Sequence, residues 1–440
     1  MNTTETKSRS TALYEEALKV LPGGISRNTI FRKPHPDYAA FGRGCRVTDI
    51  DGVTRIDFAN NMSSLIHGHA CPEIIEAVTA QLSLGTAFTM GTEQELRLAQ
   101  HLCDRNDGFD KIRFMNSGTE AVMAAIKAAR AYTGRPRIAK AEGAYHGTYD
   151  YAEVSQKSGP SNWGPDTQPA STPVSDGTPQ GALDDVIVFP FNNLDCTISL
   201  LEKHASKLAC VIIDPLPHRA GLIRASDEYT DGLRKWTLEN GVLLVLDEVV
   251  TFRMGYGGAQ NWYSVPVDLT ALGKIIGGGF PIGALAGKDE YMSVLDSTRS
   301  RIPFPHSGTY SANPVSMVAG RVAMELFDQP AIDRLNWLGD YTRQKITEAI
   351  VSSGIDACVT GAGSMFRVHL KPVPPIDYRT AYQNPAEMYR TTCLVDHMYH
   401  NGFLMFDTCA GALSTAQTES EIDQMAETLE AGFQALMHEG

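Results

Sequence analysis

The 440-residue sequence lacks the features that mark several classes of protein. It has no run of clustered Lys and Arg, and its 51 acidic side chains outnumber 38 basic ones, for a net charge of −13. Nucleic-acid binders need clustered basic groups for phosphate contacts, so we expect no nucleic-acid partner. It also has no apolar stretch near the roughly 20 residues that cross a bilayer, and no apolar N-terminal segment. We therefore expect a cytoplasmic protein without a membrane partner.

Paired cysteines and a dinucleotide-binding glycine motif are also missing. The eight cysteines are scattered with no CxxC pair, which predicts reduced, mostly buried thiols and neither a zinc or other metal site nor a disulfide framework. No GxGxxG sequence follows a predicted strand and opens a helix. Its absence excludes a nicotinamide-dependent dehydrogenase, which would otherwise suit the same fold class.

Alternating strand and helix patterns are present between residues 85 and 290. Apolar runs such as LLVL and ACVII end in acids, and helical patterns separate them. This alternation predicts an α/β fold with a doubly wound, largely parallel sheet, whose ligands lie at the carboxyl ends of the strands. Beyond Pro330 the chain changes to charged helices with a strand near GSMFRVHL, which predicts a smaller α+β lobe.

The stretch from Leu243 to Gly287 carries the strongest functional signal. A predicted buried strand delivers Asp247 to the sheet edge, and a second short run delivers Lys274 just before glycines at 277–279. A lysine in this setting is either a phosphate clamp or a nucleophilic amine. The glycines predict either that another group approaches their backbone closely or that the turn is unusual.

Two other turns add candidate ligand groups at the same edge. NSGTE is a strand-to-helix turn, so the free N–H groups and hydroxyls of residues 117–119 suit a phosphate, although many ordinary helices begin this way. GAYHG places Tyr145 and His146 at the end of a strand, where an aromatic ring can stack on a planar ligand or serve structure alone.

The remaining candidates lie in loops. Arg27 has no acidic residue within several positions, so its charge is free for a distant partner, with a surface or interface ion pair as the alternative. His67 and His69 are spaced wrongly for two ligands on one helical face, and we expect them to pack and hydrogen-bond in a loop, with a pocket-lining role as the alternative. Residues 156–182 are rich in proline and glycine, which predicts a long loop acting as a lid over a site.

A lysine, an acid, an aromatic and a phosphate cradle at one sheet edge together suit pyridoxal 5′-phosphate. A lysine amine in an apolar pocket can lose its proton near neutral pH and condense with an aldehyde. An acid such as Asp247 can keep a pyridinium nitrogen protonated, which makes the ring an electron sink.

The motifs NSGTEA, GAYHG, LDEVVTFRMGYGG, DLTALGKIIGGGFPIGALAG and HSGTYSANP occur in this order. With them the chain resembles the class III aminotransferases of the fold type I pyridoxal-phosphate enzymes, in the branch of glutamate-1-semialdehyde aminomutase and the β-amino-acid aminotransferases. The resemblance runs from LPGG at residue 21 to the C-terminal helix. It implies a large domain with a mixed, mostly parallel seven-stranded sheet flanked by helices. The implied divisions are an N-terminal segment, 1–75, that contributes to a small domain and the site entrance, a cofactor-binding domain, 76–328, and a C-terminal small domain, 329–440.

The resemblance also implies roles for single residues. Lys274 and Asp247 are the implied catalytic residues: Lys274 forms a Schiff base with the cofactor and shuttles a proton, and Asp247 pairs with the ring nitrogen. The other implied cofactor contacts are Val249 beneath the ring, Tyr145 above it, Ser117, Gly118 and Thr119 at the phosphate, and His146, Asp214 and Thr309. Thr309 matches a position that serves the neighbouring subunit, which implies a homodimer with shared active sites.

Three functions are open at this level. The first is an aminotransferase that moves an amino group from an amine or β-amino acid to a keto acid or aldehyde by a ping-pong aldimine/ketimine mechanism. The second is a glutamate-1-semialdehyde-type 2,1-aminomutase, and the third is a cofactor-binding protein without turnover, which the joint presence of Lys274 and Asp247 argues against.

Three departures from the aminomutase pattern bear on this choice. Asp214-Pro215 stands where many of these enzymes have Glu-Pro, and FLMFDTCAGALSTA lacks the glutamate of aminomutases. ISRNTIF resembles the turn whose arginine binds substrate carboxylate in β-amino-acid aminotransferases. A C-terminal arginine found in some of those enzymes is absent, which leaves Arg27 as the expected carboxylate clamp.

Overall fold

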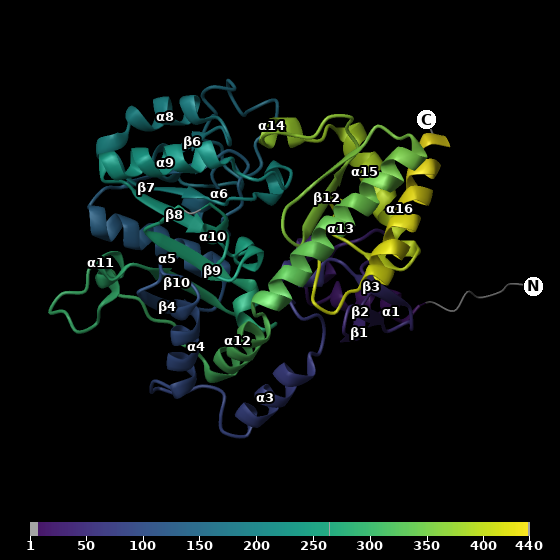
Figure 1. The fold of residues 1–440 in the computed structure, drawn as a ribbon, viewed down its shortest axis with the longest axis horizontal. Coiled ribbons are helices and arrows are strands. Elements are labelled where there is room, and N and C mark those ends of the chain that lie inside the picture. The colour runs from purple at the N-terminus through teal and green to yellow at the C-terminus, as the bar shows by residue number, and fades with distance from the viewer. Residues whose placement is uncertain (1–7, 264, 439–440) are drawn as a thin grey trace, which may run out of the picture.

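A mixed seven-stranded sheet organises the larger lobe of the computed structural model, which describes residues 8–263 and 265–438 (Figure 1). Its strand order is β4-β10-β9-β8-β7-β5-β6. The strands are β4 (Lys111–Met115), β5 (Arg137–Ala141), β6 (Val186–Phe189), β7 (Leu208–Ile213), β8 (Leu243–Asp247), β9 (Leu269–Gly273) and β10 (Gly283–Gly287). The predicted α/β class with a mixed, mostly parallel seven-stranded sheet is confirmed.

One strand of this sheet runs against the others. β10 is antiparallel to both β4 and β9, whereas β9, β8, β7, β5 and β6 are joined by parallel pairings. Because β4 and β9 are both antiparallel to β10, they share one direction. The carboxyl ends of all strands except β10 therefore meet at one edge of the sheet.

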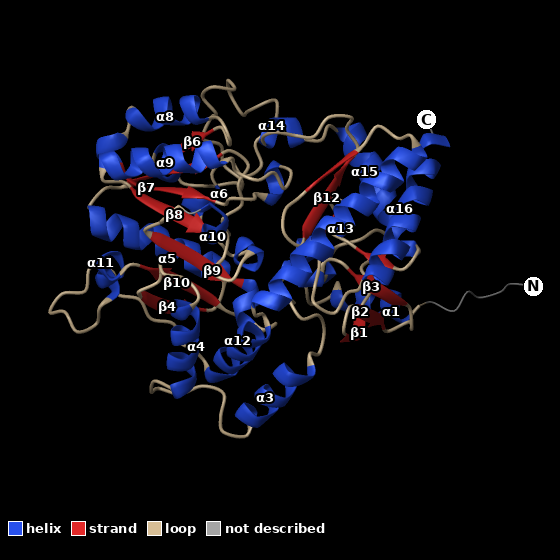
Figure 2. Cartoon of the chain, viewed as in Figure 1, coloured by secondary structure: helices blue, strands red, loops and turns tan. Residues whose placement is uncertain are grey.

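Helices cover both faces of the sheet (Figure 2). α5 shows how the sequence sets their limits: the Ser117 hydroxyl accepts a hydrogen bond from the Glu120 N–H at its start, and Gly134 ends it in a left-handed conformation, φ 68°. The helices of this lobe are α3 (Pro72–Leu82), α4 (Glu93–Asp104), α5 (Gly118–Thr133), α6 (Asp150–Glu153), α7 (Gln180–Asp184), α8 (Leu194–Glu202), α9 (Asp227–Asn240), α10 (Gln260–Tyr263), α11 (Asp289–Met292) and α12 (Pro314–Leu326).

The two ends of the chain build a smaller lobe together, at the right of Figure 1. Its first sheet has the order β1-β2-β3-β13, in which β13 from the C-terminal part pairs in parallel with β3. Its second sheet has the order β11-β12-β14. The elements are α1 (Arg9–Ala17), β1 (Ala39–Arg43), β2 (Arg46–Asp49), β3 (Thr54–Asp57), α2 (Asn60–Ser63), α13 (Gln329–Ser353), β11 (Cys358–Thr360), β12 (Met365–His369), α14 (Tyr378–Ala381), α15 (Pro385–His400), β13 (Phe403–Leu404), β14 (Ala410–Ala412) and α16 (Glu419–His438).

The lobes share a buried apolar core. One cluster contains Leu98 of α4, Met317 of α12, Leu335 of α13 and Phe433 of α16, so it runs from the large lobe into the small one. The division at residues 75 and 328 stays a prediction, and the first of these positions falls inside α3. Within the described part of the chain, no helix has the length and apolar character needed to span a membrane.

The glycines after Lys274 are approached closely by neighbouring atoms, as the sequence predicts. The 3-10 turn η6 (Lys274–Gly277) packs against α12, and a Cβ on Gly278 would lie 2.4 Å from the carbonyl oxygen of Ala319. A Cβ on Gly320 would lie only 2.1 Å from the carbonyl oxygen of Ile276. Glycine on both sides of this contact lets α12 support the turn that carries Lys274.

A Gly320→Ala variant is expected to lower the free energy of unfolding by about 1 to 3 kcal/mol, because the added methyl must displace backbone. The matched control is Gly181→Ala in α7, where no atom lies within 4 Å of the added Cβ. That control should be neutral or gain up to about 1 kcal/mol from helix propensity. Denaturant unfolding of both variants measures this, and equal stability of the two would contradict the packing described.

Candidate active site

The carboxyl edge of the large sheet brings the predicted site residues together. Three of its strands, β7, β8 and β9, are neighbours, so the residues at their ends are adjacent. The residues at this edge are Ser117 after β4, Tyr145 and His146 after β5, Asp214 after β7, Asp247 at the end of β8 and Lys274 after β9.

Asp247 is fixed by two hydrogen bonds. Its Oδ2 lies 2.7 Å from Nδ1 of His146, and its Oδ1 accepts from the Val249 N–H at 3.1 Å. His146 is 1% exposed, and burial lowers its pKa, so the ring is neutral and its Nδ1 proton points to the carboxylate. Nε2 of His146 is buried and has no partner among the described residues. The sequence indicated His146 only as a member of the turn; its contact with Asp247 required the structure.

Glu248, the acid next to Asp247, serves the fold. It is fully buried and accepts hydrogen bonds from the Ala259 N–H, at 2.5 Å, and the Gln260 side chain, at 3.2 Å. Burial raises the pKa of Glu248 to about 7. Because Glu248 holds the turn before α10, Asp247 is the acid that β8 presents to the site.

Lys274 lies beside Asp247, and hydrogen bonds to the small lobe hold its amine. Its Nζ donates to the carbonyl of Met62, at 2.5 Å, and lies 3.5 Å from Oγ of Ser63. Burial lowers the pKa of Lys274 to about 8, against the opposing effect of the Asp247 charge. The neutral amine is therefore well populated at mildly alkaline pH.

The segment that receives Lys274 is a left-handed turn. The four residues of α2 have φ values of 45°, 48°, 57° and 63°. Left-handed backbone costs roughly 1–2 kcal/mol per non-glycine residue, so surrounding contacts must fix it. Asp57 accepts from the Asn60 N–H at 2.8 Å, the Asn60 amide donates to Ala412 at 2.8 Å, and Arg253 donates to the Ser63 carbonyl at 3.3 Å. Sequence reasoning missed this turn, and the Asn-Asn pair that opens it was the available signal.

The turn from β4 into α5 has the geometry of an anion site. The N–H groups of Gly118 and Thr119 precede the first hydrogen bonds within the helix, so they remain available at the positive end of its dipole. A Cβ on Gly118 would lie 2.7 Å from the Val249 side chain, and one on Gly147 would lie 2.7 Å from Oγ1 of Thr119. The absence of a side chain at Gly118 lets Val249 pack against the turn, and its absence at Gly147 lets the loop after β5 pack against Thr119.

Tyr145 and Arg27 lie at the open side of the site. Tyr145 is 48% exposed, and the guanidinium of Arg219 lies 5.8 Å from its ring centroid. Arg27 is exposed and donates to Oδ1 of Asn61 at 2.7 Å, next to the residue whose carbonyl binds Lys274. Arg27 is thus brought to the site by the left-handed turn.

Asp214 and Thr309 complete the predicted set. Oδ1 of Asp214 accepts from the Leu216 N–H at 3.0 Å, and burial together with the negative charge of Asp247 raises its pKa well above the usual value. Thr309 is exposed on the loop before α12. A Cβ on Gly308 would lie 3.7 Å from the Asn116 amide nitrogen, so this loop borders the β4–α5 turn of its own chain. A contribution of Thr309 to a partner's site stays a prediction.

Other candidates from the sequence lie outside this group. Both ring nitrogens of His67 have partners, Thr415 at 2.9 Å and Ala323 at 2.8 Å, and His69 contacts Asp57 at 2.8 Å. The predicted hydrogen bonding of both histidines is confirmed, and both also line a pocket beside α3, as the alternative allowed. Over the described residues, no group of three or more His, Cys, Asp or Glu side chains is arranged to hold a metal ion.

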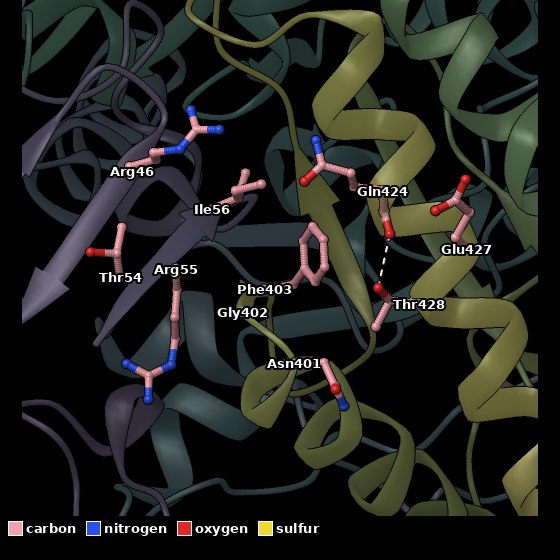
Figure 3. A pocket seen from close by; sticks show the side chains of 10 residues that line it. All are labelled: Arg46, Thr54, Arg55, Ile56, Asn401, Gly402, Phe403, Gln424, Glu427 and Thr428. Carbon is pink, nitrogen blue, oxygen red and sulfur yellow. Dashed lines mark hydrogen bonds between the residues drawn. The ribbon is translucent and has the colours of Figure 1, made fainter. Parts of the chain in front are cut away.

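A polar pocket in the small lobe does not belong to this site. It lies between β2, β3 and α16 and contains none of the residues at the sheet edge (Figure 3). Its lining residues are Arg46, Thr54, Arg55, Ile56, Asn401, Gly402, Phe403, Gln424, Glu427 and Thr428.

The loop at 156–182 is tied to α14. Arg379 pairs with Glu142 at 2.8 Å and with Asp166 at 2.5 Å, and also donates to the Trp163 carbonyl at 2.9 Å. Tyr378 donates to the Ser158 carbonyl at 2.6 Å. The loop is irregular until α7 begins at its end, and its role as a lid stays a prediction.

Comparisons with known proteins show the family to which the chain belongs. Residues 34–389 match the family model described as Aminotransferase class-III. The chain is 35% identical to a glutamate-1-semialdehyde 2,1-aminomutase of Methanosphaera stadtmanae, over 97% of this chain and 99% of that protein. A crystal structure of an omega-transaminase from Sphaerobacter thermophilus is 46% identical, with a TM-score of 0.96 over 98% of this chain and 99% of that one. A structure described as a transaminase with PLP bound is 41% identical, with a TM-score of 0.91 over 98% of each chain.

The amine of Lys274 is expected to titrate with a midpoint near pH 8 rather than the 10.5 of an ordinary lysine. In the cofactor-free protein, acylation of Lys274 by a neutral reagent, followed by mass spectrometry, should rise through that pH. Asp247→Asn should move the midpoint lower, because the Asp247 charge favours the protonated amine. A midpoint that matches those of exposed lysines in the same digest would contradict the desolvation described.

Proposed function

We propose, from the premise that this chain belongs to the class-III aminotransferase family, that it is an aminotransferase acting between an amine or β-amino acid donor and a keto acid or aldehyde acceptor. Membership confirms the resemblance predicted from the motifs, and the cofactor is pyridoxal 5′-phosphate. The observation that carries the proposal is the desolvated amine of Lys274 beside Asp247 at one sheet edge.

The residues at the sheet edge fit this cofactor. Glycine at 118 and 147 leaves room for close approach at a helix N-terminus, and a buried histidine nitrogen and a desolvated lysine amine lie nearby. The residues proposed to hold it are Ser117, Gly118 and Thr119 at the phosphate, Tyr145 and Val249 at the two ring faces, Asp247 at the ring nitrogen, Lys274 at the aldehyde, and His146, Asp214 and the partner's Thr309 around them. When bound, the cofactor supplies an electrophilic aldehyde and an electron-withdrawing ring.

Protons are handled by the residues of this chain. Lys274, once neutral, can accept the proton that leaves the amino-bearing carbon of the substrate, and it can later give that proton back. The Met62 carbonyl and the Ser63 hydroxyl accept from the protonated amine. Burial and the negative charge of Asp247 raise the pKa of Asp214 well above its usual value, which favours the protonated form of Asp214.

The sequence identities to known proteins support amino transfer over isomerisation. Two solved transaminases are 46% and 41% identical to this chain, compared with 35% and 39% for the aminomutases of Methanosphaera stadtmanae and Methanothermobacter thermautotrophicus. The segment from Phe403 to Ala416 also lacks a glutamate. An aminomutase is the second candidate, because the likeness to the aminomutase of Methanosphaera stadtmanae covers 97% of the chain.

A homodimer with shared sites is part of the proposal. Large apolar side chains between α3 and α4 are exposed in the single chain, namely Leu82, Leu84, Phe88, Met90 and Leu96, at 51%, 73%, 52%, 82% and 54%. Several large apolar side chains exposed within one short stretch of the chain are typical of a subunit interface. A partner subunit packed there would also bring a second copy of the Thr309 loop near the site.

An amino donor offered without an acceptor distinguishes the two candidate functions. An aminotransferase should release one equivalent of keto product per active site and then stop, whereas an aminomutase should release isomerised product over many turnovers. Rapid-quench analysis of products measures this directly. Lys274→Ala should give neither outcome, and continuous isomerisation by the wild type would contradict the proposed transamination.

Arg27→Ala is expected to raise the KM for carboxylated donors by about ten- to hundredfold, the range for a lost charge-assisted hydrogen bond. Amines without a carboxylate should be affected much less, because they do not use the clamp. Arg27→Lys is the matched control that keeps the charge and should restore part of the loss. Steady-state kinetics with the two donor classes test this, and an equal loss for both would refute the clamp.

A further inference from the structure

Arg219 is a cation at the site that neither the sequence motifs nor the proposed function uses. It lies in the 3-10 turn η4 (His218–Ala220), which follows β7 and Asp214. Within the described residues its guanidinium has no hydrogen bond or ion pair, and its contact is the ring of Tyr145, 5.8 Å from the centroid. Guanidinium groups that are half-buried usually have a carboxylate or phosphate partner.

Arg367 is a second cation, and it contacts the turn that carries Arg219. It lies on β12 of the small lobe, is 4% exposed, and donates to the carbonyl of His218 at 2.8 Å. Its Nε is buried and has no partner in the described part of the chain. Burial lowers the pKa of Arg367 to about 10, and the nearby acid that opposes this, Asp407, is exposed.

The two guanidinium groups belong to a local excess of positive charge. Burial and the positive charges of Arg367, Arg219 and Lys274 hold the pKa of His218 well below its usual value, and His369 acts in the same direction. No acid contributes to that shift. Asp247 and Asp214 act on Lys274 with negative charge, whereas Arg219 and Arg367 have no ion pair among the described residues. Bringing cations together out of water is unfavourable unless an anion joins them, so these two guanidinium groups suit a further anion.

The anion at this cluster cannot be the cofactor phosphate. In the strand order β4-β10-β9-β8-β7-β5-β6, the phosphate turn follows β4, whereas Arg219 follows β7 and contacts the turn after β5. Lys274, after β9, separates the two positions. The remaining anion that an aminotransferase receives beside its lysine is a substrate carboxylate.

One arginine in a fixed position does not suit the carboxylates of both the amino donor and the keto acid acceptor. In a β-amino acid the carboxylate is one carbon removed from the carbon that bears nitrogen, whereas in a 2-keto acid it is attached directly to the reacting carbon. Arg27 reaches the site through Asn61 of the left-handed turn, whereas Arg219 reaches it from the turn after β7, beside Tyr145. Two arginines on different elements can therefore meet the two carboxylates separately.

We propose that Arg219, supported by Arg367, binds the carboxylate of a 2-keto acid acceptor, while Arg27 serves the carboxylated donor. This inference rests on the proposed transamination. It names the acceptor class as keto acids, and it makes Arg219 a specificity-determining residue.

The test uses the holoenzyme and one amine donor that has no carboxylate, and it compares two amino acceptors. For Arg219→Gln, kcat/KM with pyruvate relative to kcat/KM with propanal should fall by about ten- to hundredfold. Arg224→Gln is the matched control, because Arg224 lies further along the same segment and pairs with Asp227 at 2.6 Å on the surface. The ratio should be unchanged in that control.

A binding measurement keeps the inference independent of turnover. Titration of the holoenzyme with propionate, an unreactive carboxylate, should show a Kd raised by a similar factor in Arg219→Gln and partly restored in Arg219→Lys. An unchanged Kd, or an equal loss with both acceptors, would overturn the assignment and leave Arg219 a support for Tyr145. If the wild type transfers no amino group to any acceptor, the proposed function fails, while the propionate titration still decides whether Arg219 binds carboxylate.

Discussion

Removal of the Lys274 amine from water is the constraint on which the rest of the site depends. Burial favours the neutral amine, while Asp247 on the neighbouring strand favours the protonated form, and the result is a pKa of about 8. The same burial requires acceptors for the ammonium, and Met62 and Ser63 supply them. A lysine with this balance can act as nucleophile and as proton carrier near physiological pH.

The acceptors come from the small lobe, so the site exists only when the two lobes are packed. Arg253 makes this link: it is fully buried just after β8 and donates to Ser63, Ser364 and Leu413. Burial lowers its pKa to about 9, and its hydrogen-bond partners are neutral oxygens. The left-handed turn at 60–63 is the part that costs free energy, and these contacts keep it in place.

Positive charge is distributed unequally over the site. The N-terminus of α5 follows β4. Arg219 follows β7, in the turn that Arg367 contacts, and Arg27 lies at the entrance of the site. Each position suits a different anion: the helix N-terminus suits a phosphate, and the arginines suit carboxylates. The chain has an overall charge of −13, so this local excess is a property of the site and not of the protein.

The sequence by itself determined the sheet, its carboxyl edge and the residues placed there, because buried strands, caps and glycine turns are local signals. It identified Asp247, Lys274 and the 117–119 turn, and the close approach predicted at the glycines 277–279 comes from Ile282, from Ala319 of α12 and from Leu65 in turn. The tertiary structure alone decided that Glu248 serves the fold, what holds the Lys274 amine, and that Arg367 of the small lobe contacts the turn that carries Arg219. These contacts join residues far apart in the chain, such as Met62 with Lys274, and no spacing or periodicity in one sequence records such a pairing.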